Sequence, residues 1–360
     1  MNTTVTTTLT HTILAIDLGK FKSVACAYDR ATTQARFDTV TTCQKELLRL
    51  LEQHRPAVVV IEACTLAGWV HDLCQERGVP CKVANTASEA WKFQHTKRKT
   101  DKDDALRLAQ LEALGQLPTV TIPAKQTREW RSLIAYRQRL VGRRVALQNR
   151  IRALLVGQGL AAPRGAKAWT VLGLEGIAQH ARPLADCAPE ELWRGLLDLA
   201  LTELRQTHAL LDQAEAKLDV LAQASAEVQL LETTPGVGPR TAEAVVAYLG
   251  DATRFANGKQ VSAYAGLVPK QYQSGETDRR GRITRRGPGL LRKLLVECAW
   301  VMLRYNPWAR AVYQRLTKGG TTRKKPAIVA LARKLLVRCW AMLRDGTPWR
   351  VEAVPAEADT

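Results

Sequence analysis

Three carboxylates follow a basic run in the segment 97–109, which reads Lys-Arg-Lys-Thr-Asp-Lys-Asp-Asp-Ala-Leu-Arg-Leu-Ala. The spacing predicts a helix that begins after Thr100, with Thr100 as N-cap and Asp103 completing a capping box. Asp101 and Asp104 are then neighbours on one helix face, where two carboxylates repel each other unless a cation lies between them. Acids also favour the positive end of any helix, so this segment alone leaves both explanations open.

Two more acids stand at the ends of predicted strands. Thr12 to Gly19 and Ala57 to Cys64 are apolar runs typical of buried strands. Asp17 ends the first strand and Glu62 ends the second. A carboxylate is costly to bury in such a run unless it is paired or ligated, although a turn or a cap would also explain either acid taken singly.

The four acids Asp17, Glu62, Asp101 and Asp104 fit a ribonuclease H-like arrangement, in which the first strand, the fourth strand and a late helix converge. Converging carboxylates bind hard divalent cations, and Mg²⁺ suits a strongly negative site made of oxygen ligands. Two such ions about 3.5–4 Å apart stabilise both the attacking and the leaving oxygen of a phosphodiester displacement. We therefore predict a magnesium site that acts on nucleic acid.

The segments between these acids predict a mixed α/β sheet. The expected order is three strands, helix, strand, helix, strand, helix, and the last helix carries the paired aspartates. The remaining predicted elements are strands at Ser23 to Tyr28, Ala35 to Val40 and Pro80 to Val83, and helices at Glu46 to His54 and Gly68 to Gly78.

The formal net charge of +19 is concentrated in one region of the chain. Between Arg254 and Arg350 there are 22 Lys and Arg residues against four acids. A basic excess of this density indicates a polyanion as partner, and nucleic acid fits that description. A solvated basic surface without a specific ligand is the alternative.

The cysteines and the apolar runs argue against a zinc-binding, a disulfide-rich and a membrane-spanning protein. The eight cysteines form no C-x-x-C pair and no cluster with histidine, which argues against a zinc site and against a disulfide framework. Met1 to His11 is Thr-rich and lacks a basic start followed by an apolar core, and no apolar run elsewhere approaches about 18 residues. We expect a cytoplasmic, nucleoid-associated protein without a membrane partner.

The middle of the chain predicts two long helices. Lys125 to Arg152 combines nine Lys and Arg residues with apolar residues at helical spacing, as expected of a helix between protein and nucleic acid. From about Pro189 to Leu231, leucines recur every seven residues, which is typical of a coiled coil or an antiparallel arm. The pattern leaves packing within one chain and dimerisation both open. Gly157 to Pro189, rich in Gly, Pro and Ala, is predicted to be a linker or irregular insert.

The segment Glu232 to Val245 looks like a helix-hairpin-helix element. Gly236 and Gly238 allow a tight turn whose backbone N–H groups meet a phosphate at the start of the next helix. A plain turn between two helices is the alternative. Two apolar helices, Leu290 to Arg304 and Pro326 to Leu343, complete a mainly α C-terminal domain.

Ser274 precedes a glycine in a predicted loop and is followed within twelve residues by five arginines. A serine hydroxyl is a poor nucleophile by itself, so a turn residue is the simpler explanation on chemistry alone. Guanidinium groups nearby could nevertheless hold a phosphate bidentately and stabilise the charge that builds on it. These arginines are Arg279, Arg280, Arg282, Arg285 and Arg286.

Two other basic segments are predicted to contact phosphates. One precedes the helix with the paired aspartates, and the other belongs to the loop 318–325 between the two C-terminal helices. Their cations are Lys97, Arg98 and Lys99 in the first segment, and Arg323, Lys324 and Lys325 in the second.

Taken in order, the short motifs of the chain resemble those of transposases of the insertion-sequence-110 group. The motifs are Ile16-Asp17, Ile61-Glu62-Ala63, Lys99-Thr100-Asp101-x-x-Asp104-Ala105, Pro235-Gly-Val-Gly238, Gly266-Leu-Val-Pro269, Gln273-Ser274-Gly275 and Gly287 with Leu291-Arg292. The resemblance runs over nearly the whole chain, and the combination is far more specific than any one motif.

The resemblance implies a RuvC-like domain with a D-E-D-D tetrad, a coiled-coil segment and a transposase domain with a catalytic serine. On this basis the tetrad is Asp17, Glu62, Asp101 and Asp104, and the nucleophile is Ser274. The resemblance also implies a bridge RNA that specifies target and donor DNA. It further implies a homo-oligomer, dimer or tetramer, whose active sites combine two subunits.

The resemblance also suggests domain borders. The RuvC-like domain is expected at 1–125, the helical coiled-coil region at 126–230, the transposase domain at 231–350 and a tail at 351–360. The segment 157–189 is expected to form an insert within the coiled-coil region.

We therefore expect a DNA transposase that cuts and rejoins the ends of its element and the target through Mg²⁺-dependent chemistry and a covalent phosphoserine. The alternative is a RuvC-like, structure-specific endonuclease of the junction-resolvase type, which hydrolyses DNA with metal-activated water. A non-catalytic nucleic-acid-binding scaffold on a decayed ribonuclease H fold is a third possibility. Four intact acids disfavour it, because a decayed site has no reason to keep carboxylates that repel one another.

Overall fold

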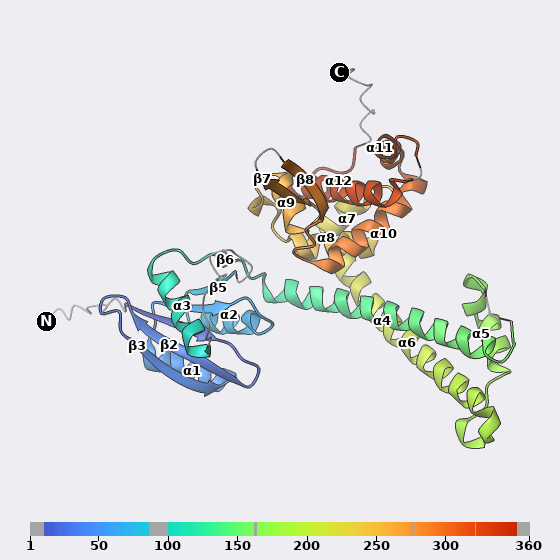
Figure 1. Ribbon diagram of the computed structural model, residues 1–360, viewed down its shortest axis with the longest axis horizontal. Coiled ribbons are helices and arrows are strands. Elements are labelled where there is room, and N and C mark those ends of the chain that lie inside the picture. The colour runs from blue at the N-terminus through green and yellow to red at the C-terminus, as the bar shows by residue number, and fades with distance from the viewer. Residues whose placement is uncertain (1–10, 86–99, 162–163, 275–276, 321, 351–360) are drawn as a thin grey trace, which may run out of the picture. The chain divides into compact units, whose positions relative to one another are not determined.

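The computed structural model describes residues 11–85, 100–161, 164–274, 277–320 and 322–350. The chain divides into two compact units, Met1–Gln126 and Thr127–Thr360 (Figure 1). Throughout the described ranges, no helix combines the length and the apolar character needed to cross a membrane.

The N-terminal unit is a mixed α/β domain with a six-stranded sheet. The predicted order of three strands, helix, strand, helix, strand, helix is confirmed, and one further strand of two residues follows it. The bounds are β1 Thr12–Asp17, β2 Lys22–Asp29, β3 Ala35–Thr41, α1 Gln44–His54, β4 Val58–Glu62, α2 Ala67–Glu76, β5 Cys81–Ala84, α3 Asp101–Ala113 and β6 Thr119–Val120.

The strands lie in the order β3-β2-β1-β4-β5-β6, and helices cover both faces. β1, β4 and β5 are parallel, whereas β2, β3 and β6 run antiparallel to their neighbours. Because side chains alternate along a strand, Leu14 and Ile16 of β1 pack with α1 and α2, while Ile13 and Ala15 pack with α3. This two-sided burial explains the nearly continuous apolar runs of β1 and β4.

The direction of α3 across the sheet is fixed at its C-terminal end by Glu112. This carboxylate is 5% exposed and accepts hydrogen bonds from Arg30 Nη2 at 3.0 Å and from Lys82 Nζ at 2.8 Å. Arg30 lies where β1 begins, since its backbone N–H donates to the carbonyl of His11. A helix of 13 residues is roughly 20 Å long, about the length of a six-residue strand. The first turn of α3 therefore reaches the edge at which β1 and β4 end.

The C-terminal unit is mostly helical and contains one two-stranded sheet. Its helices and strands are α4 Lys125–Val156, α5 Val171–Ala178, α6 Leu192–Gln223, α7 Ala226–Glu232, α8 Pro239–Leu249, α9 Gly258–Tyr264, β7 Pro269–Ser274, β8 Thr277–Ile283, α10 Gly289–Tyr305, α11 Pro307–Thr317 and α12 Lys324–Asp345.

The two long helices α4 and α6 pack against each other as an antiparallel arm within this unit (Figure 1). Leu147 contacts the cluster around Leu204, whereas Leu140, earlier in α4, contacts Leu211, later in α6. The leucines spaced by seven are thus buried inside one chain. A carboxylate–guanidinium pair between Arg137 and Glu215, at 2.5 Å, adds to the seam.

Two predictions for this region were wrong. The segment 157–189 is not irregular throughout, because it contains α5 and short 3-10 turns whose Ile177 and Trp169 pack on the end of the arm. The predicted helix from Pro189 to Leu231 is two helices, because Ser225 caps a new helix by accepting a hydrogen bond from the Val228 N–H.

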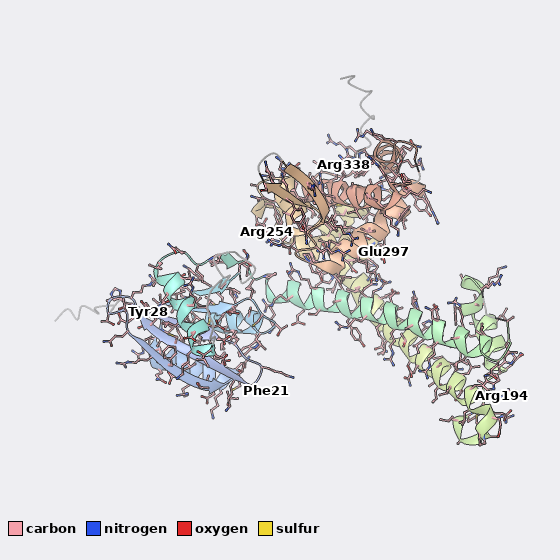
Figure 2. All side chains as sticks on the ribbon, in the orientation of Figure 1. Phe21, Tyr28, Arg194, Arg254, Glu297 and Arg338 are labelled. Atoms are coloured by element: carbon pink, nitrogen blue, oxygen red, sulfur yellow. The ribbon has the colours of Figure 1, made fainter. Side chains whose placement is uncertain are left out.

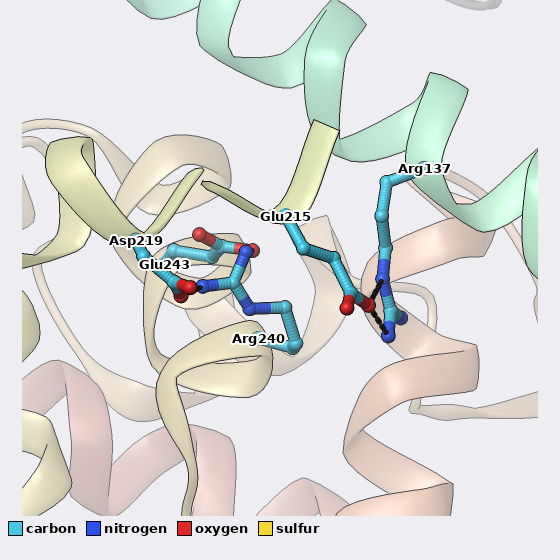
Figure 3. Close-up of polar contacts among 5 residues, drawn as sticks. All are labelled: Arg137, Glu215, Asp219, Arg240 and Glu243. Carbon is cyan, nitrogen blue, oxygen red and sulfur yellow. Dashed lines mark hydrogen bonds and ion pairs between the residues drawn. The ribbon is translucent and has the colours of Figure 1, made fainter. Parts of the chain in front are cut away.

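An ionic cluster joins the arm to α8. Arg240 pairs with Asp219 of α6 and contacts Glu243 at 3.4 Å, next to the pair of Arg137 with Glu215 (Figure 3). Glu243 is 1% exposed, and its Oε2 has no hydrogen-bond partner among the described residues. Burial raises the pKa of Glu243 to about 7, despite the opposing effect of Arg240 and Arg137.

Replacing Glu112 should destabilise the N-terminal unit. Glu112→Ala leaves Arg30 and Lys82 without their carboxylate, and we expect the free energy of unfolding to fall by about 2 kcal/mol. Glu46→Ala, which breaks an exposed ion pair with Arg49, should cost less than about 0.5 kcal/mol. Urea unfolding of both variants measures this, and equal losses would contradict the role of Glu112.

Glu243 should make the C-terminal unit less stable as the pH rises. Its folded pKa of about 7 exceeds its ordinary value of 4.5, so the unfolded chain releases this proton at lower pH. The free energy of unfolding should therefore fall between pH 4.5 and 7 by up to roughly 3 kcal/mol from this group. Glu243→Gln removes the titration. Denaturant unfolding at pH 5 and pH 8 should show a smaller difference in the variant, and an unchanged difference would refute the assignment.

Candidate functional site

Asp17 and Glu62 end two neighbouring parallel strands. Ile16 of β1 is in register with Ile61 of β4, so the next residue of each strand, Asp17 and Glu62, lie side by side at the same edge. Adjacent strands are about 4.8 Å apart. Side chains two residues apart in a strand point to the same face, and Ala15 of β1 and Val60 of β4 both pack with α3. Asp17 and Glu62 therefore lie on the face of the sheet that α3 covers. Both residues are half-buried.

The first turn of α3 brings two more carboxylates to this edge. The predicted capping box is confirmed, with the Asp103 N–H donating to Thr100 Oγ1 at 3.3 Å and the Thr100 N–H donating to Asp103 Oδ2 at 3.1 Å. The Asp103 carboxylate is therefore engaged in the hydrogen bonds of the helix cap. Asp104 is only 8% exposed and precedes Ala105, which packs on the sheet, whereas Asp101 is exposed.

These four acids share one edge but do not form a closed metal site. Among the residues that the structure describes, no three His, Cys, Asp or Glu side chains are grouped closely enough to hold an ion. The donor set itself fits a hard divalent cation, because all four groups offer carboxylate oxygens. Lys97, Arg98 and Lys99, which precede the helix, lie outside the described residues.

Ser274 lies at the end of β7, not in a loop as predicted. β7 and β8 form an antiparallel hairpin that the sequence analysis missed, and every residue of β7 is exposed. The hydroxyl of Ser274 is therefore accessible. Tyr272 is paired with Arg279, and residues paired across two strands point to the same face. Ser274, two residues after Tyr272, shares that face with Arg279.

The base of this hairpin is held by two glycines. Gly266 has φ of +64°, and a Cβ there would lie 2.0 Å from the carbonyl oxygen of Arg286. Gly287 has φ of +79°, and a Cβ there would lie 1.9 Å from the carbonyl oxygen of Tyr264. No other residue type fits these two positions without moving the backbone. They explain physically why the motifs with Gly266 and Gly287 flank the hairpin.

Arg292 of α10 is a positioning residue that the sequence analysis did not identify as functional. Its Nη1 donates to the carbonyl oxygens of Ala265 and Arg286, both at 2.9 Å, and to that of Gly287 at 3.1 Å. Burial, with a contribution from Arg285, lowers the pKa of Arg292. The sequence did contain a signal for Arg292, because this residue is the last of the motif that begins at Gly287.

The other predicted phosphate contacts are distributed over the C-terminal unit. Gly236 has φ of +92° and packs on Met302, while the exposed Gly238 precedes α8 without a side-chain cap. α8 thus starts with N–H groups that can meet an anion. The side chain of Arg280 lies outside the described residues. The exposed cations are Arg279, Arg282, Arg285 and Arg286 near the hairpin and Arg323, Lys324 and Lys325 at the start of α12.

An unpredicted helix changes the surroundings of the last three cations. α11 lies between the two predicted C-terminal helices, so the linker before α12 is shorter than expected. Lys324 and Lys325 belong to the first turn of α12, not to a loop. Asn306 caps α11 by accepting a hydrogen bond from the Ala309 N–H, and Pro307 occupies the first helical position.

Two transposase family models match the chain. The DEDD transposase model of the IS110 type matches residues 14–158, a range that contains the four acids. The model described as transposase IS116/IS110/IS902 family matches residues 228–314, a range that contains Ser274.

Several proteins are similar over most of the chain. The transposase for insertion sequence element IS1111A of Coxiella burnetii is 30% identical over 313 residues, which is 82% of this chain and 80% of that protein. A probable family 20 transposase of Pseudomonas aeruginosa is 32% identical over 318 residues, 86% of this chain and 91% of that protein. A pilin gene-inverting protein of Moraxella lacunata is similar over a shorter range, 34% identical over 123 residues, 33% of this chain and 38% of that protein.

The first matched range covers the mixed α/β unit with its acidic edge and continues through α4, and the second lies on the helical unit with its exposed serine hairpin. The first two relatives extend this likeness across more than four fifths of the chain. The chain therefore belongs to the IS116/IS110/IS902 family of insertion-sequence transposases, which are DNA-recombining enzymes.

Proposed function

We propose that this transposase cuts and rejoins DNA with two sets of groups, the four acids of its N-terminal unit and Ser274 of its C-terminal unit. The observation that supports the proposal most directly is the register of β1 with β4. It sets Asp17 beside Glu62 at the edge to which the first turn of α3 brings Asp104. A ribonuclease H-like domain of the RuvC type uses this edge for phosphodiester chemistry.

Ser274 would act as the nucleophile. Its Oγ forms a bond to phosphorus while the bond from phosphorus to one sugar oxygen breaks, and that oxygen leaves as a hydroxyl. Attack by a sugar hydroxyl of the joining strand then releases Ser274, so no phosphodiester is lost to water. Arg279, on the same face of the hairpin, is suited to stabilise the charge that develops on the phosphate.

The four acids would hold one or two divalent cations. A DEDD transposase domain indicates divalent metal use, and the all-carboxylate donor set favours Mg²⁺. When bound, such an ion supplies a Lewis acid beside the scissile phosphate. The chain's own contribution is orientation, because Glu112 holds α3 against the sheet and the capping box of Thr100 and Asp103 fixes where the helix begins.

Partners follow from the charge of the chain and from the resemblance. A transposase acts on DNA, here the element ends and the target. The basic C-terminal region, with 22 Lys and Arg between Arg254 and Arg350, is suited to a guide RNA as well as to DNA. We further infer a homo-oligomer, dimer or tetramer, in which the acids of one subunit act with Ser274 of another.

Ser274→Ala should abolish covalent protein–DNA adducts, because the variant has no hydroxyl to form the ester. DNA binding should stay within about twofold, since the residue is exposed and uncharged. Denaturing gels and mass spectrometry of the trapped peptide measure the adduct. The control variant Tyr272→Phe, which loses a hydroxyl two residues away, should still form the covalent adduct. A full yield of adduct from the Ser274→Ala protein would refute Ser274 as the nucleophile. Free hydrolysed DNA ends, produced by this variant at an unchanged rate and without an adduct, would favour the nuclease alternative.

Asp104→Asn should slow strand exchange roughly a hundredfold or more and weaken binding of Mg²⁺ or Mn²⁺. Asp103→Asn makes the same chemical change one residue away, where the side chain serves only the helix cap. The Asp103→Asn variant should keep the rate of strand exchange and the affinity for Mg²⁺ or Mn²⁺ within about threefold of the unsubstituted protein. Calorimetric titration with Mn²⁺ and a recombination assay compare the pair. Equal behaviour of the two variants would count against Asp104 as a ligand.

A further inference from the structure

A basic cavity lies in the C-terminal unit, between α9, the first residues of β7, α11 and α12. Its volume is about 1240 Å³, above the roughly 300–1,000 Å³ of a pocket for one small ligand. Five cations line it, and no Asp or Glu is found among the described lining residues. These cations are Lys259, Arg315, Arg333, Lys334 and Arg338.

The two helices that form most of the basic cavity carry no acid over the range that lines it. Residues 298–344 contain 11 Lys and Arg and not one Asp or Glu. Burial and the neighbouring Arg315, Arg333 and Arg338 lower the pKa of Lys334. Cations gathered in this way repel one another, and an anion in the cavity would relieve that repulsion.

One wall of the basic cavity is aromatic and rigid. The Arg338 guanidinium stacks over the rings of Trp308 and Trp349, at 4.6 and 4.5 Å from their centroids. Figure 2 places Arg338 on the C-terminal helices. Trp308 itself lines the cavity. Aromatic rings beside cations are how single nucleic-acid strands are bound, because bases stack on the rings while the backbone follows the charges.

The basic cavity and Ser274 lie on opposite faces of β7. Gln271 lines the cavity, and Ser274, three residues later, points to the other face of the strand. The cavity is therefore separate from the hydroxyl that the proposed function assigns to phosphodiester attack.

We propose that the basic cavity holds the sugar–phosphate backbone of one nucleic-acid strand, with a base against Trp308. It anchors the strand at a distance from the reacting phosphate. Its volume of about 1240 Å³ leaves room for more than one nucleotide unit of a single strand. This inference rests on the proposed function only in that nucleic acid is the substrate.

The test is binding of a labelled single strand to the full chain in the Ser274→Ala background, where no covalent chemistry interferes. Arg333→Gln/Lys334→Gln should weaken binding about tenfold near 0.15 M salt and reduce the slope of log affinity against log salt by about 1.4. Arg205→Gln/Lys217→Gln removes two exposed cations from α6 and should change affinity less than twofold. Arg315→Gln, on α11, gives an independent reading of the same cavity.

A comparison of DNA and RNA strands of the same sequence shows which nucleic acid supplies the strand that the basic cavity binds. A loss confined to one of them assigns the basic cavity to that nucleic acid, and a loss with both assigns it to the shared phosphodiester. Equal losses in the α6 and cavity variants, or no loss in the Arg333/Lys334 and Arg315 variants, would overturn the proposal. Adduct formation by the Arg333→Gln/Lys334→Gln chain with intact Ser274 reports the proposed function separately, because saturating DNA should restore it.

Discussion

The packing of α3 across the sheet is the constraint on which the acidic edge depends. Glu112, buried at the C-terminal end of the helix and held by Arg30 and Lys82, sets the position of α3 along the sheet, and the capping box fixes the residue at which the helix begins. Without that position, Asp17 and Glu62 would be two strand-end acids with no partner from the helix. Because α3 and β1 are of nearly equal length, fixing the C-terminal end of the helix near the start of β1 brings its first turn to the end of β1.

Charge divides the molecule into two kinds of surface. The acidic edge of the N-terminal unit suits cations, whereas the C-terminal unit gathers the positive charge around an exposed hairpin, the start of α8 and the basic cavity. In the proposed function, the second surface binds the nucleic-acid strand and the first surface holds the cations that act on its phosphates.

Much of the N-terminal unit could be predicted because its central strands, β1 and β4, are buried on both faces. Apolar runs such as Val58–Glu62 and the cap at Thr100 carry strong local signals, and the order of elements followed from them. β6, only two residues long, has no such signal. Which acids come to the same edge of the sheet depends on strand register and helix direction, which a sequence pattern does not contain.

The C-terminal unit was harder to predict for identifiable reasons. β7 is exposed along its whole length, so its sequence shows no alternation of apolar and polar residues, and Ser274 was expected in a loop. α11 was missed although Asn306 and Pro307 are ordinary helix-start signals. The roles of Arg292 and of the basic cavity arise from residues far apart in sequence that only the fold brings together.

The proposed function requires that Asp17, Glu62 and Asp104 together bind a divalent cation at the end of β1. Anomalous diffraction from crystals of the full chain grown with Mn²⁺ tests it most directly. We expect an anomalous peak within coordination distance, about 2.0–2.3 Å, of carboxylate oxygens from these three residues. A well-ordered edge with no peak beside Asp17 and Glu62, or a peak held by other residues alone, would contradict it.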